Sequence, residues 1–339
     1  MTHKDLKADT RTPINQPVPN LAQRTRCYFE ELQERICAAL EHVDGEKRFS
    51  RDVWERNEGG GGVARVLEEG AVFEKAGVNT STVFGMMPES LAQRMHVDDS
   101  RRVVDDPTRR GSLTSRPEYF GTRRVEPCQF FATGVSLVIH PRNPMVPAVH
   151  ANFRYFEQDN GDAWFGGGTD LTPYYPYDED AIHFHSTLKR ACDTHDREFY
   201  PRFKKWSDEY FFIKHRGETR GLGGIFFDYL RGDTEKYFAF VQSVGNSFLE
   251  TYLPIVHRRR EEPWGEAERA WQLVRRGRYV EFNLVYDRGT IFGLETRGRT
   301  ESILMSLPPR VHWRYDHTPI PGTREAYLVE LLMHPKDWV

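Results

Sequence analysis

The stretch that decides the fold covers residues 135–155 and reads VSLVIHPRNPMVPAVHANFRY. Two runs rich in β-branched and aromatic residues flank a loop with three prolines, and polar residues recur within both runs. Successive side chains of a strand point to opposite faces, so each run would have one apolar face and one polar face. The stretch is therefore predicted to form two antiparallel strands joined by a loop.

The polar faces of these two strands carry Ser136, His140, His150, Asn152 and Arg154. A solvent-facing strand usually carries Lys, Glu and Thr, whereas this set of side chains is typical of a lined cavity. If His140 lies opposite His150, Ser136 lies opposite Arg154 and the five side chains form one patch. The long loop leaves that register open. An ordinary amphipathic hairpin with a solvated polar face is the alternative.

The composition excludes several classes of protein. The sequence holds no run of 18 or more apolar residues and no apolar segment near its N-terminus, so neither a membrane span nor a secretory signal is predicted. The four cysteines stand far apart, which argues against zinc knuckles, iron–sulfur clusters and a disulfide framework. We therefore expect a soluble cytoplasmic protein. Its cysteines are Cys27, Cys37, Cys128 and Cys192.

The charged residues suggest the chemistry of a ligand. The formal net charge is only −3, yet 37 of the 47 basic residues are Arg. Because the guanidinium group is a flat, permanently charged fork that suits carboxylates and phosphates, this bias indicates an acidic ligand. A compositional habit without function is the alternative. No nucleic-acid partner is expected.

Periodicity and turn signals outline the remaining chain. Residues 1–20 are expected to be a flexible segment that precedes a single domain over 21–339, and the Arg- and Asp-rich stretch 88–127 is expected to be a surface insertion. The glycines of 58–66 are expected to form a tight turn between strands and not a phosphate loop. Because strands cluster without β-α-β alternation, the predicted class is α+β with a mostly antiparallel sheet. Helices are expected over 21–43, 178–200 with Asp178 as its cap, 238–258, 263–276 and 323–333; further strands are expected within 163–175, 210–230 and, with a hairpin at 287–289, 279–307.

Several long motifs in one order resemble the oxygen-dependent coproporphyrinogen III oxidases. Besides the stretch 135–155, they are WFGGGTDLTPYY (164–175), YFFIKHRGETRGLGGIFF (210–227) and GRYVEFNLVYDRGTIFGLETRGRTESILMSLPP (277–309). The resemblance extends from about Leu21 to the end of the chain. It implies a homodimer formed through roughly 280–315, and a large antiparallel sheet with helices on both faces. It also implies haem biosynthesis, in which two propionates of coproporphyrinogen III become vinyl groups, giving protoporphyrinogen IX, CO2 and reduced oxygen.

The same resemblance assigns roles to residues. His150 takes the place of a proton donor, and Asp170 that of an acid that faces the pyrrole N–H groups. Arg154 and Arg299 are cations suited to holding propionates. The substrate site implied by the matching positions consists of Ser136, Asn152, Phe153, Arg154, Asp170, Gly298, Arg299 and Thr300.

No cofactor is expected beyond O2 as co-substrate, because an electron-rich porphyrinogen can itself pass electrons to O2. Matching positions also imply a divalent metal in some members, held by His140, His150, His185 and His215. Structural roles for these histidines are the alternative, since His183 and His185 would point about 200° apart on a helix. Two rival functions stay open: an iron-dependent oxygenase that uses two His with Asp170, and a non-catalytic tetrapyrrole carrier.

Two departures from the resemblance stand out. The stretch 88–127 is longer than the usual connection. Where many members read GGR, this chain reads Arg297-Gly298-Arg299, and the extra guanidinium is expected to alter contacts with propionates.

Overall fold

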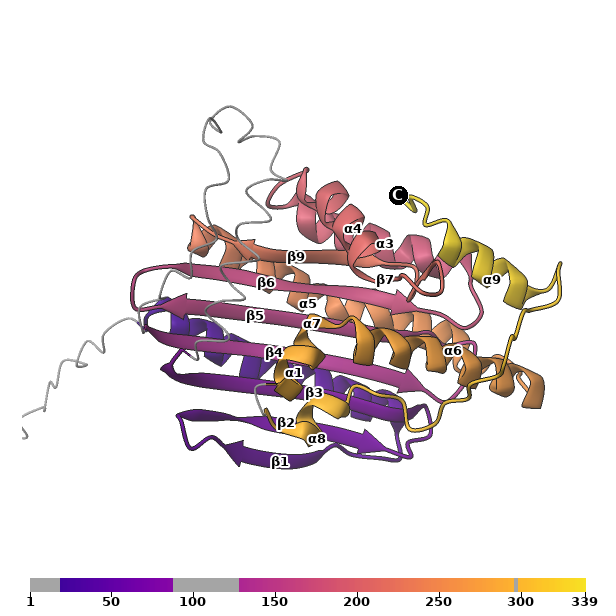
Figure 1. Ribbon diagram of the computed structural model, residues 1–339, viewed down its shortest axis with the longest axis horizontal. Helices are drawn as coiled ribbons and strands as arrows, with labels where there is room; N and C mark the ends of the chain where they lie inside the picture. Colours follow the sequence, from indigo (N-terminus) through magenta and orange to yellow (C-terminus); the bar gives the residue numbers. More distant parts are fainter. Residues whose placement is uncertain (1–18, 88–127, 296–297) are drawn as a thin grey trace, which may run out of the picture.

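A seven-stranded antiparallel sheet forms the centre of the protein, as a computed structural model that describes residues 19–87, 128–295 and 298–339 shows (Figure 1). The expected segments 1–20 and 88–127, and Arg297, lie wholly or almost wholly outside the described residues. In spatial order the strands are β1 (Ser50–Glu55), β2 (Gly60–Glu68), β3 (Phe73–Met86), β4 (Gln129–Pro141), β5 (Ala148–Gln158), β6 (Ala163–Thr172) and β9 (Gly224–Leu230). The strands β7 (Phe212–Ile213) and β8 (Glu218–Thr219) form a separate two-stranded sheet. The predicted α+β class is confirmed.

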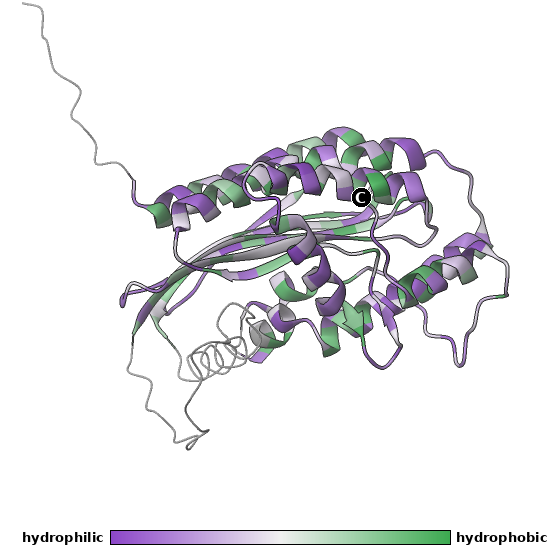
Figure 2. Cartoon of the chain, turned by 90° about the horizontal axis from the view of Figure 1, so that it is seen from above, coloured by the Kyte–Doolittle hydropathy of each residue, from purple (hydrophilic) through white to green (hydrophobic). Residues whose placement is uncertain are grey.

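Helices cover both faces of the large sheet (Figure 2). One face packs against α1 (Leu21–Asp44), α3 (Asp178–Asp193), α4 (Phe199–Tyr210) and α5 (Thr234–Arg259). The other face lies towards α6 (Glu266–Val285), α7 (Arg288–Glu295) and α8 (Thr300–Leu304), and α9 (Arg324–Met333) lies beside β8. None of the described helices is long and apolar enough to span a bilayer.

The main core lies between the sheet and helices α1 and α5. Alternate residues of β5, among them Ala151 and Phe153, point into it and are almost fully buried. Burial of one large apolar side chain contributes about 1.5–3 kcal/mol, so this layer supplies most of the driving force for folding. Helix α1 begins with a capping box at Asn20 and ends at Gly45, whose left-handed φ of 77° suits glycine.

The tight turn predicted between strands is present at residues 56–59, which lead from β1 into β2, whereas Gly60, Gly61 and Gly62 belong to β2. The antiparallel pairing of β4 with β5 is also confirmed, but the expected register is wrong by two residues. Ser136 lies opposite Asn152, and Gly134 lies opposite Arg154. The polar residues still share one face, because a shift of two residues preserves the alternation.

The expectation of strands over 279–307 is wrong. Helix α6 continues to Val285, and α7 and α8 follow it. The residues Tyr279, Phe282 and Tyr286 are strand-prone in type, yet their spacing of three and then four is helical, and this period prevails.

The strands expected within 210–230 are confirmed as the short β7 and β8 and the longer β9, although Tyr210 itself ends α4. One smaller expectation fails. Asp178 is the first residue of α3 and not its cap, since Tyr177 occupies the cap position and makes no side-chain hydrogen bond there. The acidic side chain still lies in the first turn, where the helix dipole favours it.

Candidate active site

Two rows of paired residues cross the sheet on the face that is turned away from α1 and α5. The strand pairings place His150 next to Asp170 and, in the neighbouring row, Asn152 between Ser136 and Gly168. Because strands lie about 4.8 Å apart, each row spans about 10 Å over three strands. This surface of small and polar side chains is called the polar face below.

His150, Asp170 and Arg220 form a buried relay at one end of the polar face. Nδ1 of His150 lies 2.9 Å from Oδ1 of Asp170. Arg220 donates through Nη2 to both carboxylate oxygens, at 2.7 and 2.8 Å. The side chain of Asp170 is 1 % exposed and that of His150 is 20 % exposed. The side chain that meets the open face is therefore His150, and Asp170 acts from behind it.

The protonation states within the relay follow from its charges. Burial alone would raise the pKa of Asp170, but the charge of Arg220 and the hydrogen bond with His150 outweigh it, and the net pKa lies below its usual value. The Asp170 carboxylate is therefore ionised and can only accept a hydrogen bond. The proton of this hydrogen bond is thus on Nδ1 of His150, which donates it to Asp170. Among the described residues Nε2 of His150 has no hydrogen-bond partner, which leaves this nitrogen available to a ligand.

Arg220 is held by a rigid surrounding. It donates from Nη1 to Oδ1 of Asn283 at 2.8 Å. Its guanidinium carbon lies 4.2, 4.7 and 4.8 Å from the ring centroids of Phe211, Tyr279 and Phe282. Stacking between aromatic rings suits a guanidinium group, which is more weakly hydrated than an ammonium group. The surrounding therefore fixes Asp170, and through it the orientation of the His150 ring.

Arg154 lies on the same face, four residues along β5 from His150. Its Nη2 lies 2.8 Å from Oδ2 of Asp228 on β9, and its Nη1 donates to Oδ1 of Asn152 at 2.9 Å. The Arg154 side chain is 34 % exposed, so the guanidinium group can meet an anion without losing Asp228.

Gly166 explains part of the glycine run in β6. A Cβ atom at this position would lie 2.5 Å from Oδ1 of Asp228 and 2.9 Å from Nε of Arg154. Only glycine leaves room for this ion pair. Opposite it, β9 is irregular where it pairs with β6, and Tyr229 there has a left-handed φ of 51°. Such bulges re-aim side chains, which accounts for Asp228 reaching Arg154.

The structure separates some residues that the resemblance grouped together. Phe153 does not line the polar face, because it alternates with Asn152 and Arg154 and its side chain is buried in the core. Arg299 pairs with Asp52 of β1. The loop of Gly298, Arg299 and Thr300 opens helix α8, which reaches the polar face where Asn79 donates to the carbonyl of Ser302 at 2.9 Å. Since Asn79 pairs with Ser136, this loop lies on the same side of the sheet as Asn152.

The four histidines expected as metal ligands each have partners of their own. His140 is buried and bonds through Nε2 to the carbonyl of Ser306, and burial lowers its pKa to about 3. His185 is buried between Tyr200 and the Leu222 carbonyl, and burial lowers its pKa to about 3 as well. His215 is exposed and contacts Glu281 and Tyr286. Among residues 19–87, 128–295 and 298–339, no group of three or more His, Cys, Asp or Glu is arranged to hold a metal ion.

Sequence reasoning did not single out Arg220, Asp228 or Asn283. Arg220 stands in the motif YFFIKHRGETRGLGGIFF between Thr219 and Gly221, and these neighbours do not mark it as buried. The pairing of Arg220 with Asp170 over 50 positions left no local signal. The four cysteines have free thiols in the structure.

The fold and this site define a class: an α+β protein with a histidine, a buried carboxylate and a half-exposed guanidinium group on one face of an antiparallel sheet. The family model of coproporphyrinogen III oxidase matches residues 24–338, which is nearly the whole chain. The protein therefore belongs to the coproporphyrinogen III oxidase family, whose members are oxidoreductases of haem biosynthesis.

Proposed function

We propose that the protein converts two propionates of coproporphyrinogen III to vinyl groups with O2 as the oxidant, giving protoporphyrinogen IX. Family membership supports the substrate. The observation that carries the proposal is the relay of His150, Asp170 and Arg220 on the same sheet face as the half-exposed Arg154. In this arrangement Arg154 can bind a carboxylate while the imidazole of His150 contacts another part of the same ligand.

The reaction balances without a further reductant or oxidant. Each propionate loses its carboxylate as CO2, and the carbon next to the ring loses one hydrogen with two electrons. O2 accepts these two electrons. It also takes up the proton of that hydrogen and one further proton, and so becomes H2O2. One vinyl group, one CO2 and one H2O2 are therefore formed for each O2 consumed.

In this reaction His150 exchanges the proton at the substrate. Nε2 takes a proton from a pyrrole N–H group, which makes the ring a better electron donor, and returns it as O2 is reduced. Asp170 keeps the imidazole in the tautomer with Nδ1 protonated and stabilises the imidazolium that forms. Arg220 keeps Asp170 ionised. Asp170 is thus a positioning residue, and direct contact with the pyrrole N–H groups is not required.

Arg154 is proposed to hold a propionate in a fixed direction. Each charge-assisted hydrogen bond to a carboxylate contributes about 1.5–3 kcal/mol. Ser136 and Asn152 add neutral polar contacts in the next row, and Arg299 is suited to a second propionate at the α8 side. No cofactor other than O2 is proposed.

The proposal is tested with coproporphyrinogen III supplied aerobically and anaerobically, without added cofactor. The vinyl product is expected only with O2, together with CO2 and H2O2 in equal amounts. Product formed without O2 would contradict the proposed oxidant. Activity that is lost after chelation and restored only by iron would favour the iron-dependent oxygenase instead.

We also propose a homodimer formed through residues 280–315, and a cytoplasmic location in keeping with four free thiols. This region carries several exposed large apolar side chains, which are frequent at subunit interfaces. They are Leu284, Val285, Leu294, Trp313 and Tyr315. In sedimentation equilibrium, Val285→Glu is expected to give monomers, whereas Ile182→Glu, at an exposed apolar position on α3, is expected to remain dimeric.

A further inference from the structure

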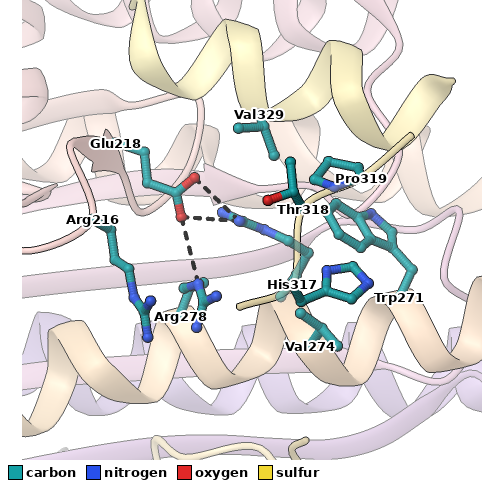
Figure 3. Close-up of a pocket in the computed structure, with 10 residues that line it drawn as sticks. Arg216, Glu218, Trp271, Val274, Arg278, His317, Thr318, Pro319 and Val329 are labelled. Atoms are coloured by element: carbon teal, nitrogen blue, oxygen red, sulfur yellow. Dashed lines mark hydrogen bonds and ion pairs between the residues drawn. The ribbon is translucent and has the colours of Figure 1, made fainter. Parts of the chain in front are cut away.

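A cavity of about 190 Å³ lies between helices α6 and α9 beneath residues 317–319 (Figure 3). It is called the α6–α9 cavity below. Its volume is enough for several water molecules or a small ligand. The described residues that line it include neither Arg154 nor any member of the His150 relay, so it is distinct from the candidate active site.

The charges around the α6–α9 cavity do not balance. Arg216, Arg275 and Arg278 line it, and the carboxylates that face these groups belong to Glu218 and Glu281. Three permanent positive charges therefore meet two negative ones. The side chains of Arg275 and Arg278 are only 5 and 10 % exposed, so solvent screens this excess weakly.

Arg275 and Arg278 each have N–H groups that do not donate a hydrogen bond. Arg275 donates through Nη1 to Glu218, and Arg278 donates through Nη1 to Glu281. Within the described part of the chain, Nη2 of neither side chain has a hydrogen-bond partner. Burial lowers the pKa of Arg278, the charge of Glu281 opposes this, and the charges of Arg216 and Arg275 lower it further. A bound anion would relieve this repulsion.

The opposite wall of the cavity is apolar. Trp271, Val274, Pro319 and Val329 line it, and the indole of Trp271 lies against the ring of His317 with centroids 5.9 Å apart. Figure 3 shows the rings of Trp271 and His317 on one side of the cavity and the side chains of Arg216 and Arg278 on the other. The guanidinium carbon of Arg275 lies 5.7 Å from the centroid of the Trp271 ring. A ligand that fits both walls carries a charged end and a flat apolar body.

We propose that the α6–α9 cavity binds a small organic carboxylate. Its carboxylate group accepts from Arg275 and Arg278, and its apolar body lies against Trp271. A carboxylate has the planar geometry that the guanidinium fork prefers, and its single negative charge equals the excess of positive charge. The proposal does not rest on the function proposed for the other face.

Calorimetric titration of the full-length protein with sodium benzoate tests the proposal. Binding is expected at about millimolar concentration, which is typical of a ligand of this size with a few charge-assisted bonds. Benzamide has the same ring without the charge, and inorganic phosphate has charge without the ring. Both are expected to bind at least about tenfold more weakly. No measurable heat with benzoate, or equal affinity for benzamide, would overturn the proposal.

Two variants locate the bound benzoate. Val329→Phe fills the cavity from α9, and Arg278→Gln removes one buried charge; each is expected to weaken binding about tenfold or more. Met333→Phe, at an exposed position of α9, is the matched control and leaves binding unchanged. Arg154→Gln also leaves it unchanged, because Arg154 lies in the other site. Thermal unfolding verifies that each variant is folded. If Val329→Phe does not fold, the binding measured with Arg278→Gln decides the test.

Benzoate that binds Val329→Phe and Arg278→Gln as tightly as the unaltered protein would contradict the assignment to this cavity. Loss of binding in Arg154→Gln alone would place the carboxylate at the other site and overturn the proposal.

Discussion

The two faces of strand β5 differ in what their side chains do. Ala151 and Phe153 point into the core between the sheet and α1. His150 and Arg154, on the opposite face, are half-buried and reach charged partners on β6 and β9. The same strand thus supplies stability on one side and chemistry on the other. Substitutions on the two faces are therefore expected to have different consequences.

The largest expected effect is on turnover, from the polar face. His150→Gln removes the proposed proton acceptor and is expected to lower kcat about 10²- to 10⁴-fold, the usual contribution of general acid–base catalysis. The free energy of unfolding is expected to fall by at most about 1.5–3 kcal/mol, the net value of one hydrogen bond to a charged group. Denaturant unfolding and steady-state kinetics measure the two quantities. Near-normal turnover would remove His150 from the mechanism.

The core face is expected to show the opposite behaviour. Phe153→Ala leaves a cavity and is expected to lower the free energy of unfolding by about 3–5 kcal/mol. Turnover per folded molecule is expected to stay the same, because the side chain does not reach the polar face. A variant of normal stability with reduced turnover would show that Phe153 takes part in substrate binding after all.

At acidic pH the free energy of unfolding is expected to fall because of two buried histidines, one on each side of the sheet, which contribute to a similar degree. His185 in α3 and His140 in β4 are buried, and burial lowers each pKa to about 3 from about 6.5. The unfolded chain takes up these protons first, so stability falls as the pH drops below about 6.5. The expected loss is about 2 kcal/mol per histidine between pH 7 and pH 5.

A glutamine in place of His185 tests this pH dependence, because its amide can keep both hydrogen bonds of the imidazole. His185→Gln is expected to unfold with a flatter pH dependence, by about 2 kcal/mol over this interval. The exposed His257 is the matched control, and His257→Gln is expected to follow the unaltered protein. Identical pH profiles for all three proteins would contradict the assignment.

The smallest expected effect concerns substrate affinity. Arg154→Gln removes a guanidinium group that is proposed to hold a propionate, and KM is expected to rise about 10- to 100-fold. Tyr155 is the neighbouring residue on the core face, where its hydroxyl donates to Glu157. Tyr155→Phe is expected to leave KM unchanged. Equal KM values in the two variants would mean that the two faces do not differ in substrate binding.

The sequence allowed the face of each residue to be predicted, but not its partner. Alternation along β4 and β5 placed Ser136, Asn152 and Arg154 together, since parity depends on the strand alone. The register was wrong because the stretch 141–147, which holds three prolines, does not fix it as a two-residue turn does.

Two other features of the structure could not be predicted from the sequence, each for a different physical reason. The stretch 279–307 was expected to form strands because its aromatic residues are strand-prone. Their helical spacing instead lets them pack between α6 and the sheet, and this packing stabilises the helix. The contact of Arg220 with Asp170 depends on how β8 lies against β6, which local sequence does not specify. The relay behind His150 was for that reason out of reach of sequence reasoning.

The central claim is that Asp170 acts through His150. A double-mutant cycle on single-turnover rates with His150→Gln and Asp170→Asn tests it most directly. If the two side chains work as one unit, the double variant is expected to be no slower than His150→Gln alone. If the two rate losses multiply in the double variant, Asp170 acts on the substrate independently and the relay is contradicted.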